Sequence, residues 1–213
     1  MTVAVKICGL TDADSVEAAI KGGADFLGFV FFDASPRHVA VEQAADLIEA
    51  VPETVPCVGL FVDPADALLD AILGQVRLDY VQLHGSETPD RVDAIRLEYG
   101  VPAIKALGVA DESDVHSGDR FVGHADRLLF DAKPPPEADR PGGNAEAFNW
   151  PLMKGYSGVL PWFLAGGLTP DTVAKAIAQS GAAAVDVSSG VESAPGQKDP
   201  ALIQAFLEAA KAG

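Results

Sequence analysis

The stretch Val3-Ala4-Val5-Lys6-Ile7-Cys8 is the first of eight short, mainly apolar runs that decide the fold. A strand with one solvent-exposed face alternates apolar and polar residues, whereas these runs consist almost entirely of apolar residues. Strands that are buried on both faces, as in a parallel sheet, have this composition. We therefore predict strands at Val3–Cys8, Phe26–Phe31, Pro56–Val62, Tyr80–Leu83, Ala103–Leu107, Arg127–Phe130, Trp162–Ala165 and Ala184–Val187.

Longer segments with helical character lie between these runs. The first follows the polar residues Thr11–Asp14 and stops at Gly22-Gly23, and a polar start with a glycine end is typical of a helix. Prolines near several other starts fit the first turn of a helix. The remaining helices are predicted around Val41–Ala50, Pro64–Leu73, Pro89–Glu98, Asp111–Ser117, Ala145–Met153, Pro170–Gln179 and Pro200–Ala212.

Strands and helices therefore alternate eight times, which indicates parallel strand pairing. An open doubly wound sheet shares this alternation, but eight units that close on themselves form a (β/α)8 barrel, the TIM-barrel fold. The Pro/Gly-rich stretch 134–144 is better explained as a long loop after the sixth strand than as a domain boundary. We predict one α/β domain, a single (β/α)8 barrel over residues 1–213.

Composition narrows the classes of partner. The net charge is −16 without a local cluster of lysine or arginine, so a nucleic acid duplex or an anionic membrane surface would be repelled. Two cysteines are too few for a disulfide scaffold, and we find neither a signal peptide nor an apolar run of membrane-spanning length. We expect a cytoplasmic protein that binds neither nucleic acid nor membrane, and either a monomer or a homodimer.

Glycines gather after the last two predicted strands, in Ala165-Gly166-Gly167-Leu168 and Ser188-Ser189-Gly190-Val191. Glycine lets a backbone approach a ligand closely, and loops that lead into helices present free N–H groups. Tight turns need glycine too, but in barrels the loops after strands seven and eight often bind phosphate. We predict a phosphate site formed by Gly166, Gly167, Ser188, Ser189 and Gly190.

Two residues that can transfer protons end the first and sixth predicted strands. A free thiol is only slightly ionised near neutral pH, so Cys8 could act as a base only beside positive charge or a proton acceptor. A buried cysteine is otherwise a small apolar filler. A carboxyl group in an apolar setting, such as Asp131 after Leu128–Phe130, can serve as a general acid, or it can cap the next turn. Position alone leaves these alternatives open.

Other charged residues near strand ends are candidates for binding an anion. The planar fork of arginine suits a carboxylate, and Arg37 follows the second predicted strand, although it could also be a solvated surface residue. Lys133 and Lys105 could serve the same purpose, and His84 is either a proton carrier or a hydrogen-bonded structural histidine. Because no His, Cys, Asp and Glu have metal-ligand spacing and no nucleotide-binding glycine motif occurs, we expect no metal and no cofactor.

These segments together resemble the phosphoribosylanthranilate isomerase family. Lys6-Ile7-Cys8-Gly9-Leu10-Thr11 is similar to its opening motif, and Gly28–Phe32 with Ser35-Pro36-Arg37 is similar to its second-strand signature. Each motif alone has little specificity, but the ordered set of motifs covers nearly the whole chain and is specific to the family. The similarity continues through Gly59–Val62, Gln82–Gly85, Leu164–Thr169 and Val185–Glu192.

The resemblance implies a sugar-phosphate substrate, N-(5-phosphoribosyl)anthranilate, and its Amadori rearrangement to 1-(2-carboxyphenylamino)-1-deoxyribulose 5-phosphate in tryptophan biosynthesis. By matching motif positions, it implies Cys8 as general base and Asp131 as general acid. It also implies that Arg37 holds the anthranilate carboxylate and that the two glycine loops hold the phosphate. We add as candidate substrate contacts Asp186, His84 and Gly143.

One segment departs from the family pattern. A Gly-Gly-Thr/Ser-Gly run is common there before a Phe-x-Trp sequence, whereas here Gly142-Gly143-Asn144-Ala145 precedes Phe148-Asn149-Trp150. Asn144 keeps a polar side chain, but Ala145 replaces a glycine. How this loop covers a substrate is therefore left open.

Two other functions are kept as alternatives. The first is another sugar-phosphate barrel enzyme, but a pentose-phosphate epimerase needs metal ligands at several strand ends. An indole-glycerol-phosphate synthase needs a catalytic lysine and glutamate, and here Cys8 ends the first strand. The second alternative is a barrel that binds a phosphate ligand without turnover, which the presence of both Cys8 and Asp131 disfavours.

Overall fold

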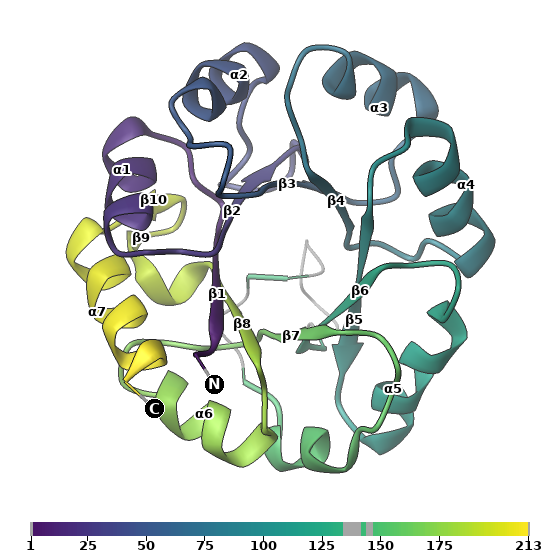
Figure 1. Cartoon of the computed structure of the whole chain (residues 1–213), viewed down its shortest axis with the longest axis vertical. Coiled ribbons are helices and arrows are strands. Elements are labelled where there is room, and N and C mark those ends of the chain that lie inside the picture. Colours follow the sequence, from purple (N-terminus) through teal and green to yellow (C-terminus); the bar gives the residue numbers. More distant parts are fainter. Residues whose placement is uncertain (1, 134–141, 144–146, 213) are drawn as a thin grey trace.

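The eight predicted strands form a closed barrel in the computed structural model, which describes residues 2–133, 142–143 and 147–212 (Figure 1). Every neighbouring pair is parallel, and the first strand pairs with the eighth to close the ring. The prediction of a (β/α)8 barrel is therefore confirmed. The strands are β1 (Ala4–Cys8), β2 (Phe26–Val30), β3 (Cys57–Phe61), β4 (Tyr80–Leu83), β5 (Ala103–Val109), β6 (Arg127–Ala132), β7 (Trp162–Leu164) and β8 (Ala184–Val187).

The α-helices surround the ring of strands (Figure 1). Local signals in the sequence set several of their ends, as at α1, where Asp12 accepts a hydrogen bond from the Ser15 N–H at 2.8 Å. Within the described residues they are α1 (Ala13–Lys21), α2 (Val41–Glu49), α3 (Asp66–Leu73), α4 (Pro89–Tyr99), α5 (Glu112–His116), α6 (Val173–Ser180) and α7 (Pro200–Lys211).

The sixth connection differs from the prediction. A helix is expected at Ala145–Met153, but the described part of this connection contains the 3₁₀ helix η2 (Trp150–Gly155) and no α-helix. Pro151 and Gly155 leave too short a stretch between them for the costly first turn of an α-helix. The fifth helix is also short, and it continues as the 3₁₀ helix η1 (Ser117–Phe121).

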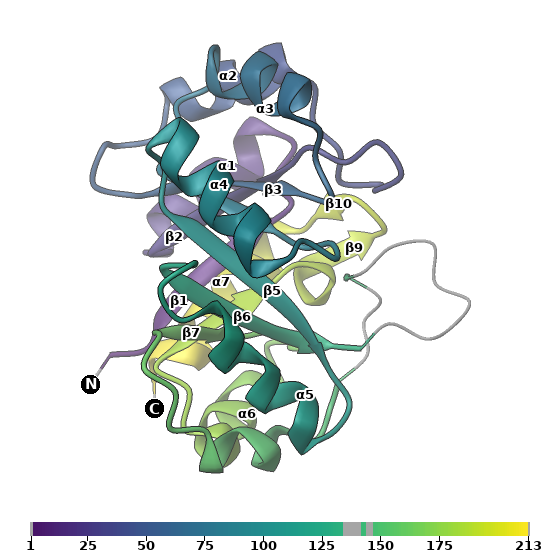
Figure 2. The same ribbon diagram turned by 90° about the vertical axis from the view of Figure 1, so that its right-hand side faces the viewer.

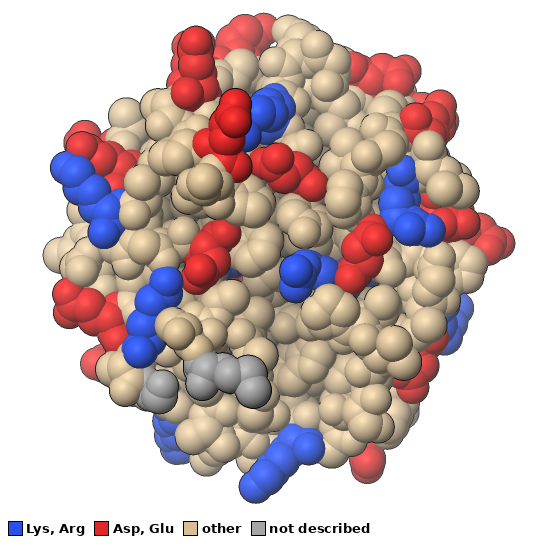
Figure 3. Space-filling model, viewed as in Figure 1, with Lys and Arg blue, Asp and Glu red and all other residues tan. Residues whose placement is uncertain are grey.

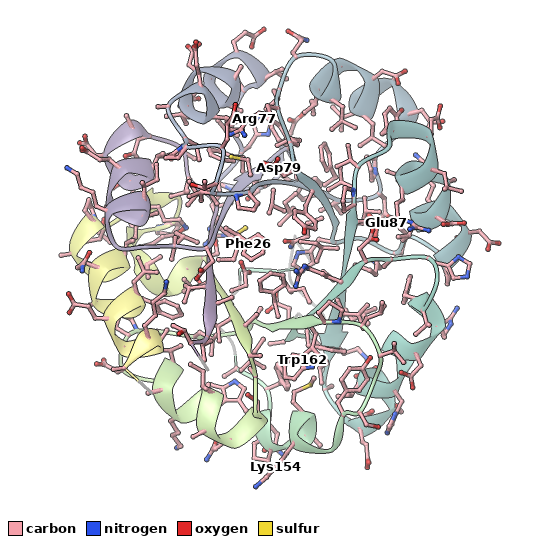
Figure 4. All side chains as sticks on the ribbon, in the orientation of Figure 1. Phe26, Arg77, Asp79, Glu87, Lys154 and Trp162 are labelled. Carbon is pink, nitrogen blue, oxygen red and sulfur yellow. The ribbon has the colours of Figure 1, made fainter. Side chains whose placement is uncertain are left out.

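Alternate residues of each strand fill the interior of the barrel, because successive side chains of a strand point to opposite faces. The apolar inner cluster holds Phe26, Val58, Ile104, Ala106, Leu129, Phe163, Ala165 and Ala184. Phe26, which lies inside the ring of strands in Figure 4, meets the Phe163 ring edge-on at a centroid distance of 5.2 Å. The Arg127 guanidinium lies 5.6 Å from the centre of the Phe26 ring. Most of these residues lie in the first half of their strands, while Ala165 follows β7, so the amino-terminal half of the barrel is a packed core.

The opposite end of the barrel carries the loops that form the site. Figure 2 shows both chain termini at one end and the hairpin of β9 (Glu192–Ala194) and β10 (Gln197–Lys198) at the other. This hairpin follows β8 and the 3₁₀ helix η3 (Ser189–Val191), and its two strands are antiparallel. The carboxyl ends of the eight parallel strands face the same way as the hairpin.

Charges are dispersed on the face that carries the termini. In Figure 3, lysine and arginine side chains stand singly among aspartate, glutamate and uncharged residues on this face. Among the helices that the structure describes, none combines the length and the hydropathy needed to cross a membrane.

Replacement of Phe163 by alanine tests the packed half of the barrel. Phe163 is fully buried, so we expect Phe163→Ala to lower the free energy of unfolding by about 3–5 kcal/mol, through lost burial and the cavity left behind. Urea unfolding measures this loss. The control is Leu97→Ala on α4, where the side chain is 69% exposed and the expected change is within about 0.5 kcal/mol. Equal losses in the two variants would contradict this description of the core.

Candidate active site

Two adjoining pockets open at the carboxyl ends of the strands. The glycine pocket is lined by Ala132, Lys133, the loop 165–168, and Val187, Ser189 and Gly190. The thiol pocket is lined by Cys8, Val30, Phe32, Ser35, Arg37, Leu60, Val62, Gln82 and His84. Five residues line both pockets, so the two form one continuous site. The shared residues are Asp131, Gly142, Gly143, Asp186 and Ser188.

Apart from Lys105, every residue named above as a candidate for the phosphate, the carboxylate, the acid, the base or a further substrate contact lies on this site. Cys8 ends β1 and Asp131 is the second-last residue of β6. These strands are separated in the ring by β7 and β8, and both residues line the thiol pocket. Chain closure thus brings together a thiol and a carboxyl group that are distant in sequence. Asn144 and Ala145 of the sixth loop lie outside the described residues.

Close backbone packing shapes the glycine pocket. Gly166 has a φ of +83° and Gly167 a φ of +62°, in the left-handed region that favours glycine. A Cβ on Gly166 would lie 2.7 Å from the backbone nitrogen of Ala132, and a Cβ on Gly190 would collide with the carbonyl oxygen of Leu168. The loops after β7 and β8 therefore pack against each other through bare backbone, which leaves a pocket with little side-chain bulk.

Asp131 is held at the junction of the two pockets. Its Oδ1 accepts a hydrogen bond from the Ala132 N–H at 2.8 Å, and its Oδ2 lies 3.4 Å from the Nε2 atom of His84. The other ring nitrogen of His84 lies 3.0 Å from the amide nitrogen of Gln82, a side chain that is fully buried. Gln82 thus orients His84, and His84 contacts the free oxygen of the Asp131 carboxyl.

Cys8 is buried at the base of the thiol pocket, with 3% of its surface exposed. Burial raises the pKa of the Cys8 thiol above its ordinary value, and the nearby charges of Lys6 and Lys198 oppose that rise only in part. The resting thiol is therefore protonated near neutral pH. Sequence reasoning predicted the need for positive charge beside Cys8 but did not identify Lys6 as its source.

Arg37 is fixed by an ion pair that sequence reasoning missed. Its Nε and Nη2 atoms donate to the two carboxylate oxygens of Glu192 at 2.7 and 2.9 Å, a bidentate arrangement. The ammonium of Lys198 donates to Glu192 at 2.6 Å and to the carbonyl oxygen of Ser188 at 3.0 Å. Glu192 and Lys198 belong to the β9–β10 hairpin, which therefore connects Arg37 with the loop after β8.

Gly143 covers the head group of Arg37. The Nη2 atom of Arg37 lies 3.4 Å from the Gly143 carbonyl oxygen, and a Cβ on Gly143 would collide with Nη1. With a φ of +72°, this position needs glycine for both reasons. The Gly143 backbone is therefore the point at which the sixth loop meets the candidate carboxylate site.

Of the two candidate lysines, only Lys133 lines the site. Lys133 is part of the lining of the glycine pocket, and its ammonium lies 3.4 Å from Asp114. Lys105 points to the outer side of β5, where it donates to Glu87 at 2.6 Å and to the Gly85 carbonyl oxygen at 2.7 Å. Figure 4 shows Glu87 on the outer side of the strands. Lys105 thus braces the loop after β4, and its suggested role in binding a ligand carboxylate is wrong.

Among residues 2–133, 142–143 and 147–212, no group of three or more His, Cys, Asp or Glu side chains is arranged to hold a metal ion.

The fold and the site together define a (β/α)8 barrel with a thiol, a carboxyl group and an imidazole at its strand ends, beside a glycine-lined pocket after β7 and β8. The chain belongs to the N-(5'-phosphoribosyl)anthranilate isomerase family, whose model matches residues 5–209. A relative from Paramagnetospirillum magneticum named N-(5'-phosphoribosyl)anthranilate isomerase is 59% identical over 213 residues, which is 100% of this chain and 99% of the relative.

Solved structures agree with this assignment. The crystal structure of phosphoribosyl anthranilate isomerase from Thermotoga maritima matches with a TM-score of 0.88 and 35% identity, covering 99% of this chain and 100% of that one. Another similar structure is a crystal structure of phosphoribosyl anthranilate isomerase in complex with reduced 1-(o-carboxyphenylamino)-1-deoxyribulose 5-phosphate. It matches with a TM-score of 0.86 and 33% identity, over 99% of this chain and 100% of that chain.

Glu192 gives the site a pH-dependent contribution to stability. Burial by itself raises the pKa of Glu192, but Arg37 and Lys198 outweigh burial, and the net pKa is lowered. The stabilisation is therefore complete above the ordinary pKa of a glutamate and is lost as the pH falls towards the lowered pKa. We expect Glu192→Gln to be less stable than wild type near neutral pH, with the difference shrinking in acid. Urea unfolding at several pH values measures this difference in stability. A difference that grows on acidification would contradict a lowered pKa of Glu192.

Proposed function

We propose that this chain catalyses the Amadori rearrangement of N-(5-phosphoribosyl)anthranilate to 1-(2-carboxyphenylamino)-1-deoxyribulose 5-phosphate, with Cys8 as base and Asp131 as acid. The observation that carries the proposal is the pairing of a thiol and a carboxyl group on one pocket, next to a glycine-lined pocket. Family membership supports the reaction, and the positions of the side chains support the assignment of roles.

The two ends of the substrate match the two pockets in charge and in shape. The phosphate enters the glycine pocket, where Gly166, Gly167 and Gly190 leave room for it against the backbone. The anthranilate ring enters the thiol pocket among Val30, Phe32 and other apolar side chains, with its carboxylate on Arg37. Glu192 uses two of the guanidinium nitrogens, so the carboxylate approaches from the Nη1 side.

The sugar then lies between the pockets, along the shared residues Asp131 and Asp186. Asp131 donates its proton to the ring oxygen, the bond from that oxygen to C1 breaks, and a protonated Schiff base forms at C1. The thiolate of Cys8 removes the proton from C2, which the adjacent cationic nitrogen has acidified. The C–H electrons form a C1–C2 double bond and neutralise the nitrogen, and the resulting enol tautomerises to the ketone.

Each turnover leaves Asp131 deprotonated and Cys8 protonated, so the two groups must exchange protons before the next substrate reacts. His84, 3.4 Å from the Asp131 carboxyl and held by Gln82, is placed to pass a proton to it. Acid and base groups held in position each contribute about 10²–10⁴-fold to rate. Fixing both ends of the substrate supplies a further part of the acceleration.

A base of this kind has to remain a reduced thiol, and both cysteines are free in this structure. A reducing compartment meets that need, so we propose that the protein acts in the cytoplasm. The expectation of either a monomer or a homodimer stays a prediction.

Substitution of the two proton-transferring residues tests the proposed roles. We expect Cys8→Ser and Asp131→Asn each to lower kcat by about 10²–10⁴-fold, because each removes one proton-transfer step. Loss of anthranilate fluorescence measures turnover, and product binding is expected to persist. The matched control for the thiol is Cys57→Ala, since Cys57 is a buried cysteine outside both pockets. Unchanged turnover in Cys8→Ser would remove the thiol from the mechanism, and near wild-type rates in Asp131→Asn would reassign the acid.

Arg37 tests which end of the substrate lies in which pocket. We expect Arg37→Ala to raise KM for the substrate and to weaken binding of free anthranilate, because the carboxylate loses its cationic partner. Inhibition by inorganic phosphate should stay close to that of the wild type. If the phosphate affinity alone changed, the two ends of the substrate would be placed the other way round.

A further inference from the structure

Lys6 is a buried lysine inside the barrel, one layer below the site. Its side chain has no exposed surface, although lysine is rarely buried completely. Strand alternation puts Lys6 on the same inner face of β1 as Cys8, two residues further along. The register pairs Lys6 with Asp186 of β8, and the Lys6 ammonium donates to the Asp186 carboxylate at 2.7 Å. The charge therefore lies within the wall of the barrel, beneath the thiol pocket.

Gly28 on β2 brings the ammonium and the thiol together. A Cβ on Gly28 would lie 2.9 Å from the sulfur of Cys8 and 3.1 Å from the Nζ atom of Lys6. Both groups thus extend over the α-carbon of one glycine, in space that any other residue would fill. Gly28 pairs with Cys8 in the register of β1 and β2, so this vacant side-chain position is built into the pairing of the two strands.

Stability alone does not explain this arrangement. Removing an ammonium and a carboxylate from water costs several kcal/mol per ion, and a well-packed apolar pair is often as stable as a buried ion pair. The neighbouring layer of the barrel is filled by apolar residues such as Phe26, Leu129 and Phe163. A charged pair next to that layer, with one member beside the thiol, points to a role in the chemistry of Cys8.

We propose that Lys6 is a positioning residue whose buried ammonium stabilises the thiolate form of Cys8, while Asp186 holds that ammonium in place and keeps it charged. This inference rests on the proposed role of Cys8 as the base. Lys6 lines neither pocket, so it acts on the reaction through its neighbours, the sulfur of Cys8 and the carboxylate of Asp186.

Charges from several strands act on Cys8. They are Lys6 on its own strand, Asp186 of β8 and Lys198 of β10. The titratable groups Arg37, His84 and Asp131, from the loop after β2, the end of β4 and β6, line the same pocket as Cys8. Burial raises the pKa of Cys8 most strongly, Lys6 is the largest charge that lowers it, and Asp186 raises it. Burial also lowers the pKa of Lys6, but Asp186 and Cys8 outweigh burial and the net pKa is raised. Lys6 is therefore charged at neutral pH.

Two substitutions of Lys6 separate an electrostatic role from a packing role. Lys6→Met keeps a long unbranched side chain but removes the charge, whereas Lys6→Arg keeps the charge but adds bulk. We use the ultraviolet absorbance of the thiolate, titrated with pH in the absence of substrate, in a Cys57→Ala background. Subtracting the same titration of the matching Cys8→Ser variant isolates the signal of Cys8.

We expect Lys6→Met to move the titration of Cys8 to higher pH, and Lys6→Arg to keep it close to the starting protein. In the rate profile, Lys6→Met should lower kcat/KM at neutral pH by at least about tenfold. A rise of about one unit in the pKa of Cys8 reduces the thiolate fraction by that factor. The kcat/KM of this variant should recover towards wild type as the pH rises. A packing role predicts the reverse order, with arginine the more damaging change and no recovery at high pH, and that result would overturn the proposal.

A second variant covers the case in which Lys6→Met does not fold because Asp186 is left unpaired. Lys6→Met/Asp186→Asn removes both charges, and since Lys6 outweighs Asp186 at the thiol, its titration should still move to higher pH. An unchanged or lower midpoint would overturn the proposal. Full activity of Cys8→Ser would instead reject the role of Cys8 as the base. The titration without substrate would still show whether Lys6 stabilises the thiolate.

Discussion

The parallel pairing of the first strand with the last is the constraint on which the site depends. Residues 4–7 of β1 lie in register with residues 184–187 of β8, and this contact closes the sheet into a ring. It sets Lys6 beside Asp186 and brings the end of β1 next to the loop that starts at Ser188. The thiol, the buried ion pair and the glycine loop after β8 are neighbours only because the two ends of the chain meet in this register.

Inner side chains change in character along the barrel axis. On β1 they run from Ala4 through Lys6 to Cys8, and on β8 from Ala184 through Asp186 to Ser188. The amino-terminal layer excludes water and supplies hydrophobic stabilisation, whereas the carboxyl-terminal layers combine apolar side chains with buried polar ones. Ion pairs and hydrogen bonds instead fix the polar groups at that end, as Glu192 and Lys198 do for Arg37. The packed half of the barrel thus supports a half in which reactive groups are buried.

Strand positions could be predicted because strands buried on both faces must be apolar, and eight such runs recur between helical segments. The strand ends then identified Cys8, His84 and Asp131, since function in a barrel lies at those ends. The helix expected at Ala145–Met153 was wrong, because a helix pattern over a short stretch that contains Pro151 says little about the turn that forms.

The partners of the charged residues could not be read from local patterns. Lys6 is 180 positions from Asp186, and Arg37 is 155 positions from Glu192, so each pair depends on ring closure. Which face of a strand a residue occupies also matters: Lys105 lies on the outer face of β5 and supports a loop, whereas Lys6 lies on the inner face of β1. A lysine within an apolar run is the signal that could have directed attention to Lys6.

A crystal structure of this chain with the reduced product, 1-(o-carboxyphenylamino)-1-deoxyribulose 5-phosphate, measures the central claim most directly. We expect the sulfur of Cys8 about 3–3.5 Å from sugar C2, the separation of a group poised to react. The Asp131 carboxyl should contact the C4 hydroxyl, which was the ring oxygen, and the phosphate should lie between the two glycine loops. A ligand with its phosphate on Arg37, or with its sugar out of reach of the thiol, would contradict the proposed mechanism.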